Sequence, residues 1–426
     1  MGLGKKNILS LLQERTEKYA DKVALGMKNR YGWKEMTYSG LGVLSRTIGA
    51  YMIDDLNLQK GERVAILSES KPEFGACVFA SILAGTITVP LDVKLTKYEL
   101  KSILSDCQPS MIFVSRKYIE MAKYLQGEIP PMKTLLVMDE PYFGMEEKSI
   151  YQLTDVSEAK WRIRKTHDTA LIIYTSGTTG KPKGVMTTFG NMLTQMYGID
   201  DTLSKIMPFR NINLLSILPM NHLFEMTVGF SAFMNFGCSI FYTPSLKPND
   251  ILSIMREKHV QFMIVVPAFL KLLKTTTENE IKSRDKFAQL RFKIKFALAK
   301  YIPSFRVKRL LFRNYHKKFG GKFVGCLSGG APLDIHVGEF FRRIGIRVFQ
   351  GYGLTETSPV WSELEASTVV YAAFVLESGL FSVPNALETS TAPSAPAINT
   401  EEPSGTVNSP SVVVRTSPVD LSFTIL

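Results

Sequence analysis

The chain has 426 residues, of which 45% are hydrophobic and 21% are charged, and its formal net charge is +12. This length allows two or three domains, and the ordinary globular composition excludes a wholly disordered chain, a collagen and a disulfide scaffold. The four cysteines stand far apart without a Cys-x-x-Cys pair, and the first residues lack the apolar core of a signal peptide, so we expect a cytoplasmic protein.

Strands and helices are predicted to alternate along most of the chain. Apolar, β-branched runs bounded by turn residues predict strands, and segments with helical spacing lie between most of them. The predicted strands cover residues 63–68, 86–91, 111–114, 134–138, 170–174, 214–218, 239–242, 262–266, 323–327 and 346–349, and the first predicted helices cover residues 73–83 and 98–105. This order is typical of an α/β fold with largely parallel sheets, whose ligands bind beyond the carboxyl ends of strands.

Two long stretches without internal charge raise the question of a membrane span. Residues 74–92 and 226–244 each approach the roughly 20 residues that cross a bilayer. Both contain glycine or asparagine and then a β-rich run, Ile87-Thr-Val in one and Ser239-Ile-Phe-Tyr in the other. We therefore predict a buried helix followed by a buried strand in each place.

Residues 281–322 form the most basic segment, with 14 basic residues and one acidic residue, Asp285. Pro303 separates two predicted helices, and Gly320-Gly321 ends the second. Such a pair can be the solvated face of helices docked to the core, or it can contact an anionic membrane surface. Nucleic acid is not expected as a partner, because no recognition-helix, zinc-finger or RNA-binding signature is present. In the first helix, five apolar residues follow helical spacing: Phe287, Leu290, Ile294, Leu298 and Tyr301.

The composition changes after Pro359. Residues 361–426 contain no lysine, one arginine and seven acidic residues, and 18 of these 66 residues are serine or threonine. This composition resembles that of a disordered segment. We therefore divide the chain into an N-terminal domain at residues 1–360 and an unmatched tail at residues 361–426.

The strongest functional signal is a loop rich in hydroxyls, glycine and lysine that directly follows the predicted strand at residues 170–174. Glycines let backbone N–H groups approach an anion closely, hydroxyls add donors, and lysines add positive charge. The loop predicts a polyphosphate cradle, although it is not a Walker A loop, because its glycines are too close together and Pro182 follows the first lysine. The cradle residues are Thr175, Ser176, Gly177, Thr178, Thr179, Gly180, Lys181 and Lys183.

A second motif, Gln-Gly-Tyr-Gly-Leu-Thr-Glu-Thr-Ser-Pro at residues 350–359, also follows a predicted strand. The ring of Tyr352, which precedes Gly353, can lie against a flat base. Thr355 can donate a hydrogen bond to a phosphate oxygen, and Glu356 supplies the hard oxygen that Mg²⁺ prefers. The motif predicts a nucleotide and metal site.

A third motif, Leu-Ser-Gly-Gly-Ala-Pro-Leu at residues 327–333, consists mainly of small residues at a strand end. Gly330 and Ala331 leave room for a ligand to approach the backbone. We expect this strand end to lie in the same site as the other two motifs.

Together and in this order, the motifs resemble those of the AMP-forming acyl-CoA synthetases, the adenylate-forming family that includes luciferases and peptide-synthetase adenylation domains. The loop at residues 175–183 is similar to that family's phosphate loop almost residue for residue, and Leu-Pro-Met-Asn-His-Leu-Phe-Glu at residues 218–225 is similar to the motif that precedes its acyl pocket. The resemblance covers about residues 7–359. The last motif and the basic insert are most similar to the long-chain fatty acid members. The family's N-terminal domain has stacked, mostly parallel sheets flanked by helices.

The resemblance implies a reaction in two steps. A fatty carboxylate attacks the α-phosphate of ATP with Mg²⁺, giving acyl-adenylate and pyrophosphate, and a thiol of coenzyme A then takes the acyl group. The resemblance places Thr355 at the α-phosphate, Glu356 on Mg²⁺ and His222 beside the carboxylate. A lone histidine outside such a motif would more often be structural.

The resemblance also implies how ATP is held. The loop at residues 175–183 would bind the β- and γ-phosphates, and Tyr352 would stack on the adenine above Gly330 and Ala331. An acyl carrier protein in place of coenzyme A, and a non-catalytic remnant that only binds ATP or fatty acid, are the alternatives.

The resemblance stops at Pro359. Family members continue with a Thr-Gly-Asp that binds the ribose and with a small mobile C-terminal domain that supplies a catalytic lysine. The tail here has no lysine, and its one aspartate, Asp420, stands in Pro-Val-Asp-Leu. We interpret the tail as the product of a frameshift or truncation, with a short variant and a chimera as alternatives, and expect impaired turnover.

Overall fold

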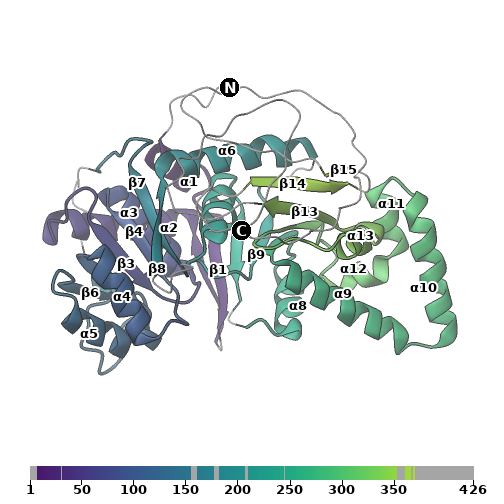
Figure 1. The fold of residues 1–426 in the computed structure, drawn as a ribbon, viewed down its shortest axis with the longest axis horizontal. Coiled ribbons are helices and arrows are strands. Elements are labelled where there is room, and N and C mark those ends of the chain that lie inside the picture. The colour runs from purple at the N-terminus through teal and green to yellow at the C-terminus, as the bar shows by residue number, and fades with distance from the viewer. Residues whose placement is uncertain are drawn as a thin grey trace, which may run out of the picture. The chain divides into compact units, whose positions relative to one another are not determined.

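Two β-sheets organise the described part of the chain (Figure 1). The computed structural model describes residues 7–29, 31–154, 161–176, 182–206, 210–243, 245–352, 360–365 and 368–369. The chain divides into two units, Met1–Glu377 and Ser378–Leu426, and every described residue belongs to the first.

The larger sheet has nine strands in the order β15-β14-β13-β12-β11-β9-β10-β1-β2. Strands β13 to β1 in this order are parallel to their neighbours, whereas β2 and β14 join antiparallel at the two sides. The bounds are β1 (Val23–Asn29), β2 (Gly32–Thr37), β9 (Asn213–Ser216), β10 (Ser239–Tyr242), β11 (Phe262–Val265), β12 (Gly325–Ser328), β13 (Arg347–Tyr352), β14 (Val360–Glu365) and β15 (Thr368–Val369).

The smaller sheet has six strands in the order β6-β5-β3-β4-β7-β8. All its neighbouring pairs are parallel except β7 and β8, which form an antiparallel pair at one edge. The bounds are β3 (Arg63–Leu67), β4 (Ile87–Leu91), β5 (Met111–Val114), β6 (Thr134–Val137), β7 (Thr169–Ser176) and β8 (Pro182–Thr188). The predicted α/β class with mostly parallel sheets is confirmed.

Helices connect most of the parallel strands. Their ends carry ordinary stop and start signals; for example, Thr96 and Glu99 form a capping box at the start of α4. The α-helices are α1 (Ile8–Lys18), α2 (Tyr38–Ala50), α3 (Pro72–Ala84), α4 (Lys97–Cys107), α5 (Ile119–Glu128), α6 (Phe189–Ile206), α7 (Phe233–Asn235), α8 (Pro248–Glu257), α9 (Pro267–Lys282), α10 (Lys286–Leu298), α11 (Phe305–Leu311), α12 (Arg313–Lys318) and α13 (Ile335–Arg343). The described residues also form five other helical segments: η1 (Tyr51–Asp55) and η4 (Glu225–Ala232), which are π-helical, and η2 (Arg116–Tyr118), η3 (Ile150–Gln152) and η5 (Ala299–Tyr301), which are 3₁₀.

The helix α3 is buried along its whole length, and it contacts β3 and β4 of the smaller sheet and β1 of the larger one. Its Phe79 ring lies 5.0 Å from that of Phe230 on η4, centroid to centroid. Both apolar stretches therefore form buried helices followed by buried strands, α3 with β4 and η4 with α7 and β10, as predicted. Within the described residues, no helix combines the length and apolarity needed to cross a membrane.

The basic insert forms α10, α11 and α12 rather than two helices. The second predicted helix is interrupted at Phe312, which is buried between α11 and α12. Gly320 and Gly321 follow α12 in the left-handed conformation (φ of 76° and 72°), which favours glycine and ends the helical path as predicted.

Candidate functional site

Four parallel strands of the larger sheet end at the same edge. Their registers pair Ser216 of β9 with Ile264 of β11, Val265 of β11 with Ser328 of β12, and Ser328 with Gln350 of β13. The segments that follow these strands are the His222 motif, Val266, the Gly329–Ala331 turn and the end of β13 at Tyr352. Three sequence motifs, the first and last of which are more than 100 residues apart in the chain, therefore lie together at this edge of the larger sheet.

The ring of Phe224 packs against the ends of two of these strands, β12 and β13. A Cβ atom on Gly329 would lie 2.8 Å from this ring, and a Cβ on Gly351 would lie 3.2 Å from it. The Gly329 amide donates a 3.0 Å hydrogen bond to the carbonyl of Val265. Glycine is thus required at residue 329 because the ring occupies the space of any side chain.

The turn at Gly330 is open above the backbone. Gly330 has a φ of +79°, and the nearest atom to a Cβ placed there is Val266 Cγ1 at 3.9 Å. The side chains of the described residues therefore leave the backbone of this turn uncovered. Ala331 is exposed beside it.

His222 lies where the two sheets meet. Its side chain is exposed, yet the surrounding protein lowers the pKa of the imidazole, because partial desolvation disfavours the imidazolium; Asp92 opposes this shift and Lys94 adds to it. Asp92 directly follows β4 of the smaller sheet. A neutral imidazole at neutral pH is the expected state.

A second contact joins the same segment to the smaller sheet. The amide of Met220 donates a 3.0 Å hydrogen bond to the hydroxyl of Ser70, which in turn donates one of 3.4 Å to the carbonyl of Leu218. Ser70 follows β3, so the carboxyl ends of β3 and β4 face the His222 motif.

The predicted phosphate loop joins β7 and β8. Thr175 pairs with Lys183 and Ser176 with Pro182 across this antiparallel ribbon. The parallel pairing of Leu171 with Thr88 puts Thr175 at the level of Asp92, four residues further along each strand. The start of the loop therefore stands at the edge that faces His222.

Several predicted site residues lie outside the described residues or have undescribed side chains. Ser176 and Tyr352 are described only through their backbones, at the ends of β7 and β13. In the described residues, no group of three or more histidine, cysteine, aspartate and glutamate side chains is placed to hold a metal ion. Outside the description lie Gly177, Thr178, Thr179, Gly180, Lys181, Gly353, Thr355 and Glu356.

Glu225 was not predicted as a site residue. It begins η4, its side chain is fully buried, and its Oε1 accepts a 2.6 Å hydrogen bond from the hydroxyl of Ser216 at the end of β9. Burial raises the pKa of this carboxyl to about 8, because the charged form is desolvated. A single carboxylate at the head of an otherwise uncharged stretch was the signal that could have identified it.

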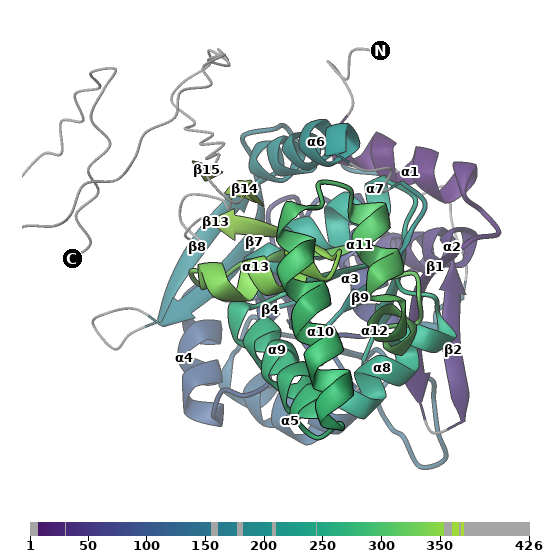
Figure 2. The same ribbon diagram turned by 90° about the vertical axis from the view of Figure 1, so that its right-hand side faces the viewer.

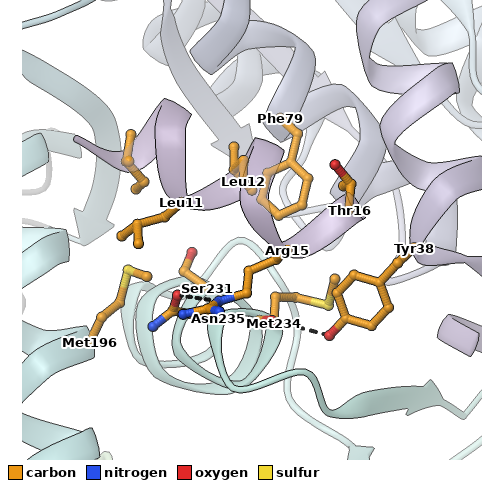
Figure 3. Close-up of a pocket in the computed structure, with 11 residues that line it drawn as sticks. Leu11, Leu12, Arg15, Thr16, Tyr38, Phe79, Met196, Ser231, Met234 and Asn235 are labelled. Carbon is orange, nitrogen blue, oxygen red and sulfur yellow. Dashed lines mark hydrogen bonds between the residues drawn. The ribbon is translucent and has the colours of Figure 1, made fainter. Parts of the chain in front are cut away.

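A small pocket lies between α1 and the η4–α7 segment (Figure 3). Its lining is mainly apolar, with one polar pair in which Arg15 Nε donates a 3.2 Å hydrogen bond to Asn235 Oδ1. The cavity holds about 20 Å³, enough for about one water molecule and too little for a nucleotide or an acyl chain.

The parallel strand ends, the β7–β8 hairpin and the small-residue turns lie at the carboxyl ends of strands, where α/β proteins bind their ligands. The chain belongs to the AMP-binding enzyme family, whose model matches residues 12–375. This match continues beyond residue 359, where the motif resemblance stops.

Known relatives are about a quarter identical to this chain over the aligned residues. It is 25% identical over 348 residues to the long-chain-fatty-acid–CoA ligase FadD15 of Mycobacterium bovis, covering 76% of this chain and 56% of that protein. It is 25% identical over 382 residues to the ligase ACSBG1 of Homo sapiens (82% and 52%), and 24% identical over 400 residues to the long-chain-fatty-acid–CoA ligase of Bacillus subtilis (84% and 61%). The chain thus spans only 52–61% of the length of these curated relatives.

Solved structures share the fold. The N-terminal domain of FACL13 from Mycobacterium tuberculosis aligns with a TM-score of 0.63 at 21% identity, over 83% of this chain and 77% of that one. ATP-bound MatB from Rhodopseudomonas palustris aligns with a TM-score of 0.63 at 23% identity, over 84% and 62%. These likenesses support stacked, mostly parallel sheets flanked by helices.

Proposed function

We propose that this chain activates a long-chain fatty acid with ATP as an acyl-adenylate and transfers the acyl group to coenzyme A. The observation that carries the proposal is the meeting of His222, the Gly330 turn and the end of β13 at one edge of the larger sheet, opposite the end of β7. Family membership and the long-chain relatives support the same reaction class.

The phosphates would lie at the β7–β8 hairpin. Thr175 and Lys183 face each other across it, so hydroxyl and cationic groups would flank the β- and γ-phosphates bound by residues 176–181. The adenine would lie over the open Gly330 turn beside Ala331, with Tyr352 against its face. Charge neutralisation and alignment, rather than a protein nucleophile, supply the catalysis in this scheme.

The acid would lie on the other side of the nucleotide. His222, neutral at pH 7, would orient the fatty carboxylate without an ion pair, so the carboxylate keeps its charge for attack on the α-phosphate. Thr355 would donate to an oxygen of that phosphate.

A magnesium ion would be held mainly by the phosphates, with Glu356 as the protein ligand. Mg²⁺ in such sites needs only one or two carboxylates, so a set of donors without a preformed cluster is compatible with it. When bound, the ion neutralises phosphate charge.

Fatty-acid-dependent exchange of labelled pyrophosphate into ATP tests the proposal. Exchange requires reversible adenylate formation, so the proposal predicts exchange with a long-chain fatty acid and none without it. Lys183→Gln is expected to lower the exchange at least tenfold, whereas Lys117→Gln, a change of an exposed lysine on η2, is expected to leave it unchanged. ATP binding without any exchange would contradict the proposal and favour a non-catalytic ATP- or fatty-acid-binding remnant.

The acceptor is tested separately. If exchange occurs, adding coenzyme A should give acyl-CoA, which chromatography detects. Acyl transfer to a carrier protein but not to coenzyme A would instead favour an acyl-[acyl-carrier-protein] ligase.

A further inference from the structure

The helix α10 has two apolar faces. One face packs on the core: the ring of Phe292 lies 5.6 Å from that of Phe312, and the ring of Phe296 lies 5.5 Å from that of Phe340. Ala299, just beyond the helix, is fully buried. The helix is thus held in place by residues other than the apolar set whose spacing predicted it.

The second face is formed by that predicted set. Its members are 52% to 79% exposed, and their spacing of three, four, four and three residues puts them on one side of the helix. We call this set the α10 stripe; it consists of Phe287, Leu290, Ile294, Leu298 and Tyr301. Figure 2 shows α10 foremost, along the outside of the helices that flank the larger sheet.

The exposed apolar side chains of the described residues are concentrated here. Eighteen large apolar residues are exposed in the part of the chain that the structure describes, and seven of them lie within residues 287–310. Two of the seven, Val307 and Leu310, are one turn apart on α11. A cluster of this kind marks an interaction surface, whereas single exposed apolar residues need no explanation.

Basic residues border the α10 stripe on both sides. At 100° per residue, Arg291 and Lys295 fall along one border, and Lys286, Lys293 and Lys300 fall along the other. Among the described residues, no acidic side chain forms an ion pair with Arg291 or Lys293. The single acid of this helix region, Asp285, caps α10 by accepting a 2.8 Å hydrogen bond from the amide of Ala288.

We propose that the α10 stripe docks this protein peripherally on the surface of an anionic lipid bilayer, with α10 lying in the plane of the interface. Apolar side chains along the centre would enter the boundary between headgroups and acyl chains. The long basic side chains on each border would reach the phosphates, because Lys and Arg can bury their stems while their charge stays in the polar layer.

Charge favours a lipid surface over a second copy of the chain. A symmetric dimer through the α10 stripe would bring two sets of these cations together without described acidic partners, and like charges across an interface are repulsive. An anionic bilayer instead neutralises both borders at once. If the proposed ligase function holds, docking here also places the chain where long-chain fatty acids concentrate; the docking itself does not depend on that function.

Co-sedimentation of the full chain with lipid vesicles tests the proposal. We expect binding to phosphatidylcholine vesicles that contain phosphatidylglycerol, weak binding to pure phosphatidylcholine vesicles, and loss of binding at high salt. The triple variant Leu290→Ser, Ile294→Ser, Leu298→Ser should bind at least tenfold more weakly. Arg291→Gln with Lys293→Gln should weaken binding by about fivefold for each charge removed.

Matched controls keep the test decisive. Tyr98→Ser, Ile163→Ser and Leu246→Ser change three equally exposed apolar residues elsewhere, and Lys117→Gln with Lys133→Gln removes two exposed charges elsewhere. Both control variants should bind vesicles as the parent does. Because all the altered residues are exposed, circular dichroism should show that every variant stays folded.

Three results would overturn the proposal. One is equal binding of the parent and the α10 variants to vesicles; another is no vesicle binding by the parent. The third is an oligomer of the parent, detected by light scattering, that the α10 variants lose and the control variants keep. This result would assign the stripe to contact with a second copy of the chain.

Discussion

The hydroxyl of Ser216 donates a 2.6 Å hydrogen bond to Oε1 of Glu225, and no described residue bonds to Oε2 of this buried carboxyl. Ser216 ends β9 and Glu225 begins the π-helical segment η4, so the bond ties the strand end to the helix that follows the His222 motif. Because burial raises the pKa of Glu225 to about 8, the carboxyl carries its proton at neutral pH.

Glu225→Gln should flatten the fall of stability with rising pH. The folded pKa of about 8 lies above the reference value of 4.5, so the folded state keeps a proton that the unfolded state releases. The proton on Glu225 therefore stabilises the folded state. This stabilisation, of up to about 5 kcal/mol, is complete below pH 4.5 and is lost as the pH rises through about 8. The variant keeps an acceptor for Ser216 but does not titrate.

Urea unfolding of both proteins across this pH range measures the effect. The parent's free energy of unfolding should fall relative to that of Glu225→Gln as pH rises. Parallel curves would show that the Glu225 carboxyl is ionised in the folded protein.

His316→Gln should have the opposite signature at lower pH. His316 is buried, its Nε2 lies 2.7 Å from the carbonyl oxygen of Ile344, and desolvation lowers its pKa from 6.5 to about 4. As the pH falls, His316 therefore takes up a proton in the unfolded state before it does so in the folded state. Its contribution to the free energy of unfolding is complete above pH 6.5 and is lost as the pH falls toward 4, by up to about 3 kcal/mol. Glutamine can still donate to Ile344 and removes this acid sensitivity.

The same urea titration in acid checks this result, with His167→Gln as the control because His167 is 75% exposed. The control should follow the parent at every pH. If His316→Gln loses stability toward pH 4 as steeply as the parent, a group other than His316 causes the loss of stability in acid.

The ten predicted strands all appear, because each is a compact apolar run that the fold buries. The strands that were not predicted are β1, β2, β8, β14 and β15, and all except β1 join their sheets antiparallel at or near an edge. In β8, for example, Lys183 and Gly184 are exposed, so no apolar run predicts the strand. Pairing with β7 stabilises it instead.

The site was partly predictable for a related reason. Motifs that directly follow parallel strands must lie at the carboxyl ends of those strands, and this rule alone predicts that Gly330 and Tyr352 lie at one edge of a sheet. The buried pairing of Ser216 with Glu225 depends on the π-helical turn, which has no clear sequence signal. The spacing of the α10 stripe was visible in the sequence, but its exposure was not, since Phe292 and Leu290 are both apolar and only the neighbouring helices decide which is buried.

Glu73→Gln should destabilise the protein far more than Glu140→Gln. Lys34 Nζ lies 2.8 Å from a carboxylate oxygen of each residue, but Glu73 is buried and also accepts a 2.9 Å hydrogen bond from the hydroxyl of Tyr151. Neutralising Glu73 leaves the charge of the half-buried Lys34 without its buried counter-charge, which should lower the free energy of unfolding by about 3 kcal/mol. The exposed pair of Lys34 with Glu140 contributes less than about 1 kcal/mol.

Thermal or urea unfolding at neutral pH compares the two variants. Because they share one lysine, the difference measures what the burial of Glu73 and its contacts with Tyr151 and Lys71 add. Equal losses would mean that Glu73 contributes no more than a surface ion pair.

Gly329→Ala should disrupt the strand ends that form the candidate site. Its Cβ would lie 2.8 Å from the Phe224 ring, closer than carbon atoms normally approach, so the ring or the turn must move. We expect a loss of about 1–3 kcal/mol in stability, as for overpacking elsewhere, and a larger relative loss of fatty-acid-dependent pyrophosphate exchange. Gly127→Ala is the control, because a Cβ there would meet no atom within 4 Å beyond its chain neighbours and the backbone of its own helix, α5, in which alanine is favoured.

The double variant Gly329→Ala, Phe224→Leu separates a steric cause from a general one. Leucine lacks the ring atoms that Cβ would meet, so part of the stability and of the exchange should return if the clash with Phe224 is the cause. The interaction energy from this double-mutant cycle should therefore be favourable. If the double variant is as impaired as the sum of the single changes, the Phe224 ring does not set the position of the Gly329–Ala331 turn, and the turn must be held mainly by the hydrogen bond from Gly329 to Val265.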